Sequence, residues 1–206
     1  MTIIKYLNNC TELIKLIGEY SASGKLFAFM SRRVAELHPI LAKTVERSCR
    51  VCLIENEEAY KNIESVTDLW KFLSANGADR EARIIAIGGG AITDLSGFTA
   101  STYMRGIQCI YVPTTLLSMI DASIGGKTAI NIDRIKNLAG TFHQLRGFNF
   151  TRISKNITAT RTFKRFCRSN QTRHSIRRKR LPFFERNYIK HKRNKLGSFH
   201  KNEYRV

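Results

Sequence analysis

The feature that most constrains this chain is an apolar tetrapeptide that leads directly into three glycines. Ile84-Ile85-Ala86-Ile87 is followed by Gly88-Gly89-Gly90, and a helix-forming sequence begins at about Ala91. An apolar run without polar alternation is typical of a parallel strand that is covered on both faces. The order strand, glycine turn, helix therefore predicts a βα unit whose backbone N–H groups can approach an anionic ligand closely.

Further apolar runs and helical spacings place this unit in a larger α/β domain. Helical spacing recurs at Leu13 to Ile17, at 34–45 with a break at Pro39, and at 63–73, ending at Asn76-Gly77. Strands are predicted at 26–30, 51–54 and 107–112. Alternating helices and strands predict right-handed βαβ units and an open parallel sheet, so the predicted fold class is α/β and Rossmann-like.

The charge of the chain changes sharply after Gln144. Residues 1–144 hold 16 lysines and arginines against 14 acidic residues, whereas residues 145–206 hold 19 against 2. The predicted domains are therefore an α/β domain at 1–144 and a basic tail at 145–206. The tail lacks apolar periodicity, so we expect it to be mostly disordered.

Composition also narrows the classes of function. No apolar run reaches the roughly 18–20 residues that span a bilayer, and the first twenty residues lack a signal-peptide pattern, so no membrane association is expected. Five scattered cysteines suggest reduced thiols and a cytoplasmic location, and Cys49-x-x-Cys52 is a weak metal or redox candidate. The basic tail could bind nucleic acid through its cations and interspersed aromatic residues, but it matches no named module. Non-specific binding of polyanions is expected from charge alone.

Candidate ligand-binding residues follow the glycine triplet. Asp94, one turn into the helix, could hold a ribose or substrate hydroxyl, and Thr114-Thr115 offers hydroxyls and N–H groups at a strand end. The same stretch contains Arg105, Asp121, Lys127 and Lys136. Singly these residues have ordinary interpretations as solvated charges, and His143 is more often structural than catalytic. Together, cations and N–H donors without a paired carboxylate suit a phosphorylated small molecule.

At this point the motifs resemble those of the 3-dehydroquinate synthase family, in the sugar-phosphate cyclase superfamily, over about residues 25–144. Order and spacing both match the family. The matching motifs are Glu58-x-Tyr60-Lys61, Gly88-Gly89-Gly90-x-x-x-Asp94-x-x-Gly97-Phe98, Tyr103-x-Arg105-Gly106, Val112-Pro113-Thr114-Thr115-Leu116-Leu117, Asp121-x-Ser123-x-Gly125-Gly126-Lys127-Thr128 and Lys136-Asn137-x-x-Gly140-x-Phe142-x-Gln144.

The resemblance implies a homodimeric enzyme with an N-terminal NAD-binding α/β domain and a helical C-terminal domain. In the family a glutamate and two histidines of the helical domain hold zinc or cobalt. The reaction converts 3-deoxy-D-arabino-heptulosonate 7-phosphate into 3-dehydroquinate and phosphate, in the shikimate pathway. A substrate hydroxyl is oxidised by NAD, phosphate is eliminated, and the ketone is reduced again before ring opening and closure.

The resemblance also assigns roles by position. The residues expected to contact NAD are Glu58, Lys61, Gly88, Gly89, Gly90, Asp94, Thr114, Thr115, Lys127 and Lys136. Those expected to act on substrate are Asp121, Lys127, Lys136 and Asn137, with Arg105 reaching the phosphate from the neighbouring subunit. The chain departs from the family at Ser31 and Asn56, where the family has aspartates, and at Thr93, where glycine is common. The first of these aspartates helps to hold the adenosine.

After Gln144 the resemblance stops abruptly, which suggests a shifted reading frame. If Leu145 is encoded by CTC and Arg146 by CGA, removing the T gives Pro-Glu, and permitted codons then continue as the family does through its A-E-V-I-K segment. On this hypothesis the helical domain and its metal ligands are missing from the chain, which is expected to be inactive. Two enzymatic alternatives remain: another sugar-phosphate cyclase, and a relative of metal-dependent alcohol dehydrogenases.

Overall fold

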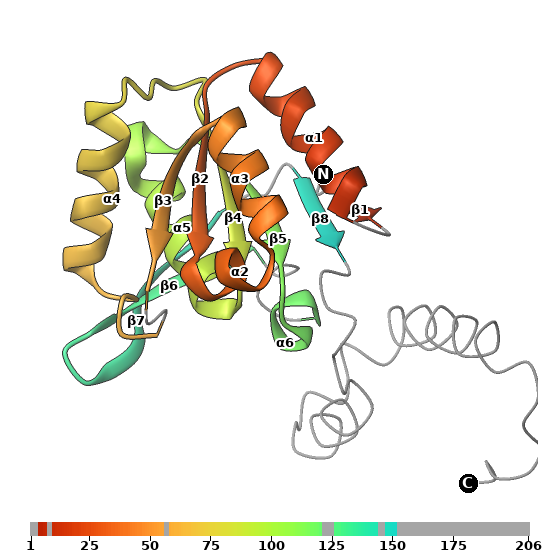
Figure 1. Cartoon of the computed structure of the whole chain (residues 1–206). Coiled ribbons are helices and arrows are strands. Elements are labelled where there is room, and N and C mark those ends of the chain that lie inside the picture. Colours follow the sequence, from red (N-terminus) through yellow and green to blue (C-terminus); the bar gives the residue numbers. More distant parts are fainter. Residues whose placement is uncertain (1–3, 8–9, 56–57, 121–125, 144–146, 152–206) are drawn as a thin grey trace, which may run out of the picture. The chain divides into compact units, whose positions relative to one another are not determined.

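A computed structural model describes residues 4–7, 10–55, 58–120, 126–143 and 147–151 (Figure 1). The chain divides into units 1–157 and 158–206, and every described residue lies in the first. The elements are β1 (Ile4–Leu7), α1 (Cys10–Ala22), β2 (Leu26–Ser31), α2 (Arg32–Leu37), α3 (Pro39–Ser48), β3 (Arg50–Ile54), α4 (Ile63–Ala75), β4 (Arg83–Gly88), α5 (Gly90–Thr102), the 3-10 turn η1 (Tyr103–Arg105), β5 (Gln108–Pro113), α6 (Leu116–Ile120), β6 (Lys127–Ile132), β7 (Ile135–Phe142) and β8 (Gly147–Thr151).

The main sheet has six strands in the order β1-β8-β5-β4-β2-β3, and every described pairing in it is parallel. The strand β4, which carries the glycine turn, lies between β2 and β5. Met30 is paired with Ile87 on one side of β4, and Pro113 is paired with Gly88 on the other. The carboxyl ends of β2, β4 and β5 therefore lie side by side, where parallel sheets bind ligands. The predicted α/β class is confirmed.

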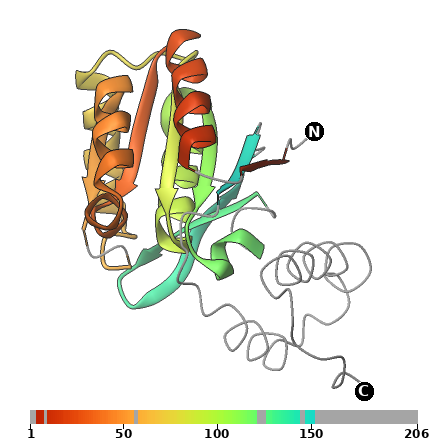
Figure 2. The same cartoon turned by 45° about the vertical axis from the view of Figure 1, so that its right-hand side comes forward.

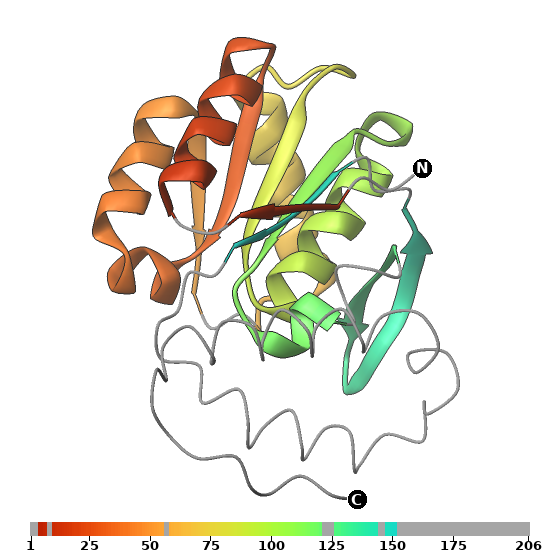
Figure 3. The ribbon, with the colours of Figure 1, turned by 90° about the vertical axis from the view of Figure 1, so that its right-hand side faces the viewer.

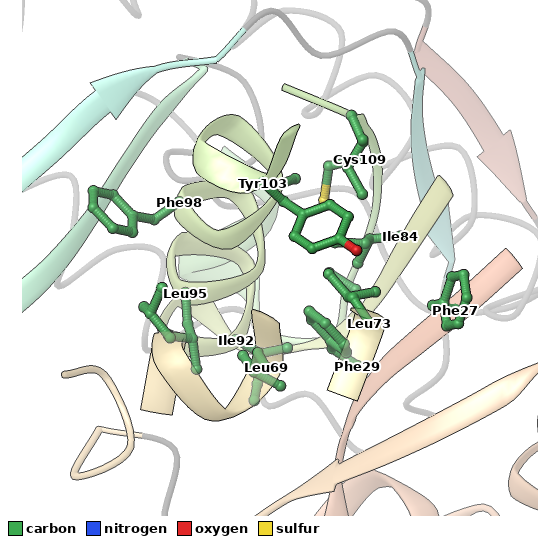
Figure 4. Packing of buried hydrophobic residues seen from close by; sticks show 14 of the residues in the cluster. Phe27, Phe29, Leu69, Leu73, Ile84, Ile92, Leu95, Phe98, Tyr103 and Cys109 are labelled. Carbon is green, nitrogen blue, oxygen red and sulfur yellow. The ribbon is translucent and has the colours of Figure 1, made fainter. Parts of the chain in front are cut away.

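Two helical layers cover the sheet, α1 and α3 on one face and α4 and α5 on the other (Figures 1 and 3). In β4, Ile84 and Ala86 belong to the core beneath α4 and α5, whereas Ile85 and Ile87 belong to the core beneath α1 and α3. Figure 4 shows the first core, with Leu69 and Leu73 of α4 close to Phe29 of β2. An unbroken apolar strand is thus explained by burial on both faces.

The predicted element boundaries agree closely with this structure. The break at Pro39 separates α2 from α3, with the proline in the first turn of α3, where its missing N–H costs nothing. Asn76 caps α4, and Gly77 has a left-handed φ of 71°. Among the described helices, none combines the length and apolarity needed to cross a membrane.

Four features were not predicted: β1, α6, β8 and the antiparallel pair β6–β7, here called the ribbon. The ribbon lies against α5, and its turn lies near the carboxyl ends of the strands (Figures 1 and 2). β8 pairs with β5 and β1 although it follows the predicted boundary at 144. Five residues of the predicted tail are therefore in the sheet, and the rest of 145–206 lies outside the described residues.

Candidate functional site

The glycine turn between β4 and α5 is built for close approach. A Cβ on Gly88 would lie 2.7 Å from Cβ of Ile92, so glycine is needed there for the helix to pack on the strand. A Cβ on Gly90 would meet nothing within 4 Å. Gly89 is the N-cap of α5 and makes no side-chain capping bond, which leaves the first N–H groups of a 13-residue helix available to an anion.

The neighbouring strand end brings the predicted threonines next to this turn. The Thr114 N–H donates to the carbonyl of Gly88 at 2.8 Å. The Thr115 hydroxyl lies 2.8 Å from the Ser118 hydroxyl and accepts from the Ser118 N–H at 3.2 Å, so it caps the short helix α6. The structure therefore places both threonines beside the glycine turn, with the Thr115 side chain occupied by a local cap.

A buried lysine joins three separate segments of the chain. Lys61 Nζ donates to Asp94 Oδ2 at 2.6 Å and to Asn137 Oδ1 at 2.5 Å. The Lys61 side chain is only 5% exposed and that of Asp94 21%. Because burying an ammonium group is costly without partners, these contacts fix Lys61 between Asp94 of α5 and the ribbon. The structure thus brings together three predicted site residues.

Asn131 of the ribbon is a residue that sequence reasoning missed. Its N–H donates to the carbonyl of Lys61 at 2.7 Å, its Nδ2 donates to Glu58 Oε1 at 3.2 Å, and its Oδ1 accepts from the Asn137 N–H at 2.9 Å. The register of the ribbon shifts between Ile130 and Ile132, so Asn131 lies at a bulge. Asn137 has a left-handed φ of 56°, which its bond to Asn131 holds in place.

Glu58 also contacts Lys136, with 3.4 Å between its Oε1 and Lys136 Nζ. Both side chains are more than half exposed, so the pair contributes little to stability. The contact does place Glu58, which is predicted to bind NAD, next to Lys136, which is predicted to bind NAD and substrate. Glu58, Lys61, Asp94, Lys136 and Asn137 therefore form one continuous group.

Two other predicted residues lie apart from this group. Lys127 is paired with Phe142 at one end of the ribbon, whereas Lys136 lies beside the turn at the other end. Lys127 and Asn131 are four positions apart in β6, which is on the order of 13 Å along an extended strand. Arg105 precedes β5 and so lies at the amino end of that strand, opposite to the glycine turn. Lys127 and Arg105 therefore lie apart from Lys61 and Lys136 within one chain.

The remaining predicted site residue, Asp121, lies outside the described residues, as does Asn56.

Arg105 follows Met104 in a turn where both have left-handed φ values, of 70° and 48° respectively. Such values are strained for residues with side chains and are found mainly where the surroundings impose them. The turn leaves Arg105 exposed at the protein surface.

His143 has a structural role. Its Nε2 lies 2.9 Å from the carbonyl of Ile107, and its N–H donates to the carbonyl of Gly126 at 2.8 Å. Burial lowers the pKa of His143, and its bond to Ile107 only partly opposes this effect. Neutral His143 therefore connects the end of the ribbon to the start of β5 through these hydrogen bonds.

The C-x-x-C pair does not form a thiol site. Cys49 packs with the core beneath α1 and α3, and Cys52 with the core beneath α4 and α5, so the sheet separates them. Burial raises the pKa of Cys49 to about 12, and burial together with Asp68 raises that of Cys52. Thiolates, which metals and redox partners need, are disfavoured at both positions.

The described residues fit a dinucleotide better than a metal. The open glycine turn, the helix N-terminus and the adjacent threonines provide N–H and hydroxyl groups for a diphosphate and ribose. Within the described ranges, no three His, Cys, Asp or Glu side chains are grouped so that they could hold a metal ion. A metal ion would need ligands from elsewhere.

Solved structures with this fold define the class. The chain superimposes with a TM-score of 0.64 and 28% identity on 2-epi-5-epi-valiolone synthase of Streptomyces hygroscopicus subsp. jinggangensis 5008, which has NAD+ and Zn2+ bound, covering 73% of this chain and 43% of that one. A 2-deoxy-scyllo-inosose synthase complexed with carbaglucose-6-phosphate, NAD+ and Co2+ matches with a TM-score of 0.60 and 27% identity, covering 72% and 41%. The fold is thus that of the NAD-linked sugar-phosphate cyclases. An iron-containing alcohol dehydrogenase at 13% identity shares the fold alone.

The family is shown by the sequence comparisons. The family profile described as 3-dehydroquinate synthase N-terminal matches residues 51–164, more than half of the chain. A 3-dehydroquinate synthase of Alkaliphilus oremlandii is 49% identical over 109 residues, which cover 53% of this chain and 30% of that protein. The chain belongs to the 3-dehydroquinate synthase family.

Two facts qualify the extent of the match. The chain spans about a third of the length of the curated relatives, between 30% and 40% of each of the first four. The family profile runs to residue 164, twenty residues past the predicted end of the resemblance at Gln144. The profile therefore does not reproduce the abrupt stop that motivated the shifted-frame hypothesis, which stays a prediction.

Proposed function

We propose that this chain is the dinucleotide-binding part of a 3-dehydroquinate synthase, which converts 3-deoxy-D-arabino-heptulosonate 7-phosphate into 3-dehydroquinate and phosphate. One observation carries the proposal. The buried Lys61–Asp94 pair lies one turn beyond an open glycine turn and is joined by Asn137 of the ribbon. Sequence identities of 41–49% to curated synthases support this reaction over that of another cyclase.

Each part of the site has a task in this proposal. The N–H groups of Gly89 and Gly90 bind the diphosphate, and Gly88, Thr114 and Thr115 shape the turn. A nicotinamide dinucleotide, when bound, accepts and returns a hydride. Glu58, Lys61 and Asp94 hold its hydroxyl and amide groups. The turn thereby orients the dinucleotide toward the ribbon.

The ribbon and the turn at Arg105 would serve the substrate. Lys136 and Asn137 contact the substrate beside the dinucleotide, together with Asp121, and stabilise negative charge that develops next to the oxidised carbon. Lys127, at the other end of the ribbon, contacts a separate anionic group. Arg105 lies on the wrong edge of its own sheet, so it acts on the phosphate bound by a second copy in a homodimer.

We further propose that the 206-residue chain binds the dinucleotide but does not turn over substrate. The described residues do not fit a divalent metal, and the match covers only 30% of the length of the first relative. Zinc or cobalt and its ligands would come from the part of the relatives that the match does not cover. The cytoplasmic location expected from the sequence belongs to the same proposal.

Binding is tested by calorimetry of the full chain with NAD+. The Gly90→Val variant is the decisive comparison, because the added side chain enters space that is open in the fold but is needed by a diphosphate. Gly18→Val, on α1, is the matched control, since its Cβ also meets nothing within 4 Å. We expect binding to the native chain and to Gly18→Val, and loss of it in Gly90→Val. Equal binding by all three proteins would contradict the proposed site.

Turnover is tested by phosphate release from the heptulosonate phosphate in the presence of NAD+ and Zn2+ or Co2+. We expect none from the pure chain, and metal-dependent release would refute the proposed inactivity. Restoring the shifted frame should give an active synthase. Release from other sugar phosphates, but not from the heptulosonate phosphate, would favour another cyclase.

A further inference from the structure

We propose that Asn131 is a positioning residue for this reaction, which orients the Glu58 carboxylate for the dinucleotide and at the same time fixes Asn137 beside it. The inference rests on the proposed function, because it gives a task to a residue that touches neither ligand in that proposal. Asn131 lies in β6, where the register of the ribbon shifts between Ile130 and Ile132. It is thereby placed to join the loop before α4 to the strand β7.

The Asn131 side-chain amide makes one bond toward each of these segments. Its Nδ2 donates to Glu58 Oε1 at 3.2 Å, and its Oδ1 accepts from the Asn137 N–H at 2.9 Å. A side-chain amide offers donors and an acceptor in one planar group. That single group therefore sets the position of the Glu58 carboxylate relative to the Asn137 backbone. A carboxylate or an aliphatic side chain could not make both bonds.

The attachment of the loop to the ribbon does not depend on the side chain of Asn131 alone. The Asn131 N–H donates to the carbonyl of Lys61 at 2.7 Å, and Lys61 Nζ donates to Asn137 Oδ1 at 2.5 Å. Both bonds are retained when only the side chain at position 131 is exchanged for another polar one. We therefore expect such variants to fold, so that their ligand binding can be measured.

Glu58 needs a partner of this kind because its side chain is otherwise weakly held. The carboxylate is 55% exposed, and its other described contact is Lys136 Nζ at 3.4 Å, on a side chain that is 75% exposed. An exposed ion pair does little to orient its members. Both described contacts use Oε1, so Oε2 can accept from a hydroxyl of the dinucleotide while Asn131 stays bound. An acceptor that is already oriented lowers the entropy cost of binding.

This coupling has to act in both directions. If the bond from Asn131 to Glu58 strengthens dinucleotide binding by some factor, the bound dinucleotide strengthens that bond by the same factor. Because the same amide group holds the Asn137 N–H, a bound dinucleotide should protect that N–H from exchange with solvent. A residue with a purely structural role would stabilise the ribbon equally with and without the dinucleotide.

The test is a double-variant cycle on the full chain, with NAD+ binding measured by calorimetry. Asn131→Asp keeps an acceptor for the Asn137 N–H but replaces the donor to Glu58 by a second carboxylate. We expect it to weaken NAD+ binding roughly three- to tenfold, which corresponds to one hydrogen bond. In a Glu58→Gln background the same exchange should change the affinity by less than about twofold, because the new amide at position 58 can donate to the new carboxylate.

Hydrogen exchange provides a second readout. Saturating NAD+ should slow exchange of the Asn137 amide in the native chain by roughly the same three- to tenfold, but not in Asn131→Asp. Asn76→Asp is the matched control, because Asn76 is exposed at the C-terminal end of α4, where its Nδ2 donates to the carbonyl of Phe72 at 2.8 Å. It makes the same exchange of amide for carboxylate and should leave both readouts unchanged.

The outcomes separate this inference from the proposed function. Unchanged NAD+ affinity in Asn131→Asp would overturn the inference and leave the proposed function standing. A loss of affinity that persists in the Glu58→Gln background would be due to added negative charge and would overturn the inference as well. A native chain that does not bind NAD+ would overturn both.

Discussion

The helix α5 lies between two regions that are held together in different ways. On one side it packs on β4 and β5 through fully buried apolar side chains such as Ile92 and Leu95 (Figure 4). On the other side it meets the ribbon, whose strand β7 leaves Leu138 55% and Phe142 82% exposed. Ile130 of β6 is buried in the same core, but hydrogen bonds also hold the ribbon at both ends of α5. Thr141 donates to Ser101 near the end of α5, and Lys61, paired with Asp94 near its start, donates to Asn137.

This difference separates what the sheet positions from what the ribbon positions. The glycine turn is part of a continuous core, so its shape depends on the stability of the whole domain. A two-stranded ribbon is at best marginally stable by itself, so the positions of Lys136 and Asn137, near its exposed turn, depend on a small number of polar contacts. We infer that nucleotide-binding geometry is robust and that substrate-binding geometry is easily lost.

The largest effect is expected at Gly97, where the two regions meet. A Cβ there would collide with Tyr111 Oη of β5 and Thr128 Cγ2 of β6. Gly97→Ala must therefore push α5 away from the sheet, the ribbon or both, and we expect it to lower the free energy of unfolding by roughly 3 kcal/mol. Urea unfolding measures this loss.

Gly18→Ala is the control for that variant, since Gly18 lies in the middle of α1 with open space around its Cβ. It should raise the free energy of unfolding by about 0.5–1 kcal/mol, because alanine favours a helix over glycine. A Gly97→Ala variant as stable as the native chain would show that α5 is not confined between sheet and ribbon.

The next effect is expected at Lys61, which joins the ribbon to α5. Lys61→Met removes the ammonium group from Asp94 and Asn137 but keeps most of the apolar stem. We expect a loss of about 2–3 kcal/mol, since Asp94 retains some contact with solvent. Lys71→Met is the control, because Lys71 pairs with Asp68 at 3.4 Å on an exposed surface and should change stability by less than about 0.5 kcal/mol.

Lys61→Met should also loosen the ribbon more than the sheet. Hydrogen exchange should become faster at amides of β6 and β7 than at those of β4 and β5. Uniform acceleration over both regions would mean that Lys61 stabilises the domain globally, which would contradict the distinction between the two regions.

A smaller and more local effect is expected at Asn131. Asn131→Ala removes the side-chain bonds to Glu58 and to the Asn137 N–H and should destabilise the ribbon by about 1–2 kcal/mol. Asn131→Asp keeps an acceptor for Asn137 but faces Glu58 with a second carboxylate, so only the contact with Glu58 should be lost. The exchange rate of the Asn137 amide distinguishes the two variants, and equal acceleration in both would refute a role for the Asn131 Oδ1.

Four of the six strands of the main sheet, β2 to β5, could be predicted because their pattern is local. Ile84 to Ile87 are apolar without interruption because both faces are covered, and the spacing of Val66, Leu69 and Leu73 results from one buried face of α4. The sequence indicates the turn of the ribbon only weakly. Asp133-Arg134, between Ile132 and Ile135, is not one of the residue pairs that two-residue hairpin turns favour.

The site was only partly predictable, because local sequence patterns account for only some of its residues. The glycine turn and Asp94 follow from a strand and a helix, but Lys61 was found through its family motif and not from any periodicity. Asn131 acts through a bulge and through a loop some seventy residues earlier, which no local pattern encodes. Lys127 and Lys136 are close in sequence, yet a ribbon places residues on either side of its turn at distances that depend on register.

The smallest expected effect concerns pH and the base of the ribbon. Burial lowers the pKa of His143, so the folded chain binds fewer protons than the unfolded chain near the titration of histidine. The contribution of neutral His143 is complete above the unfolded pKa of about 6.5 and is lost as pH falls toward the lower, folded value. His143→Gln keeps an N–H donor for the Ile107 carbonyl but does not titrate. The native chain should therefore lose more stability than His143→Gln when the pH falls from 7.5 to 5, as measured by urea unfolding at both pH values.

His38→Gln is the control, because the His38 side chain makes no capping bond, and this variant should follow the native profile. Parallel profiles for the native chain and His143→Gln would show that the ribbon is anchored at this end by backbone bonds alone.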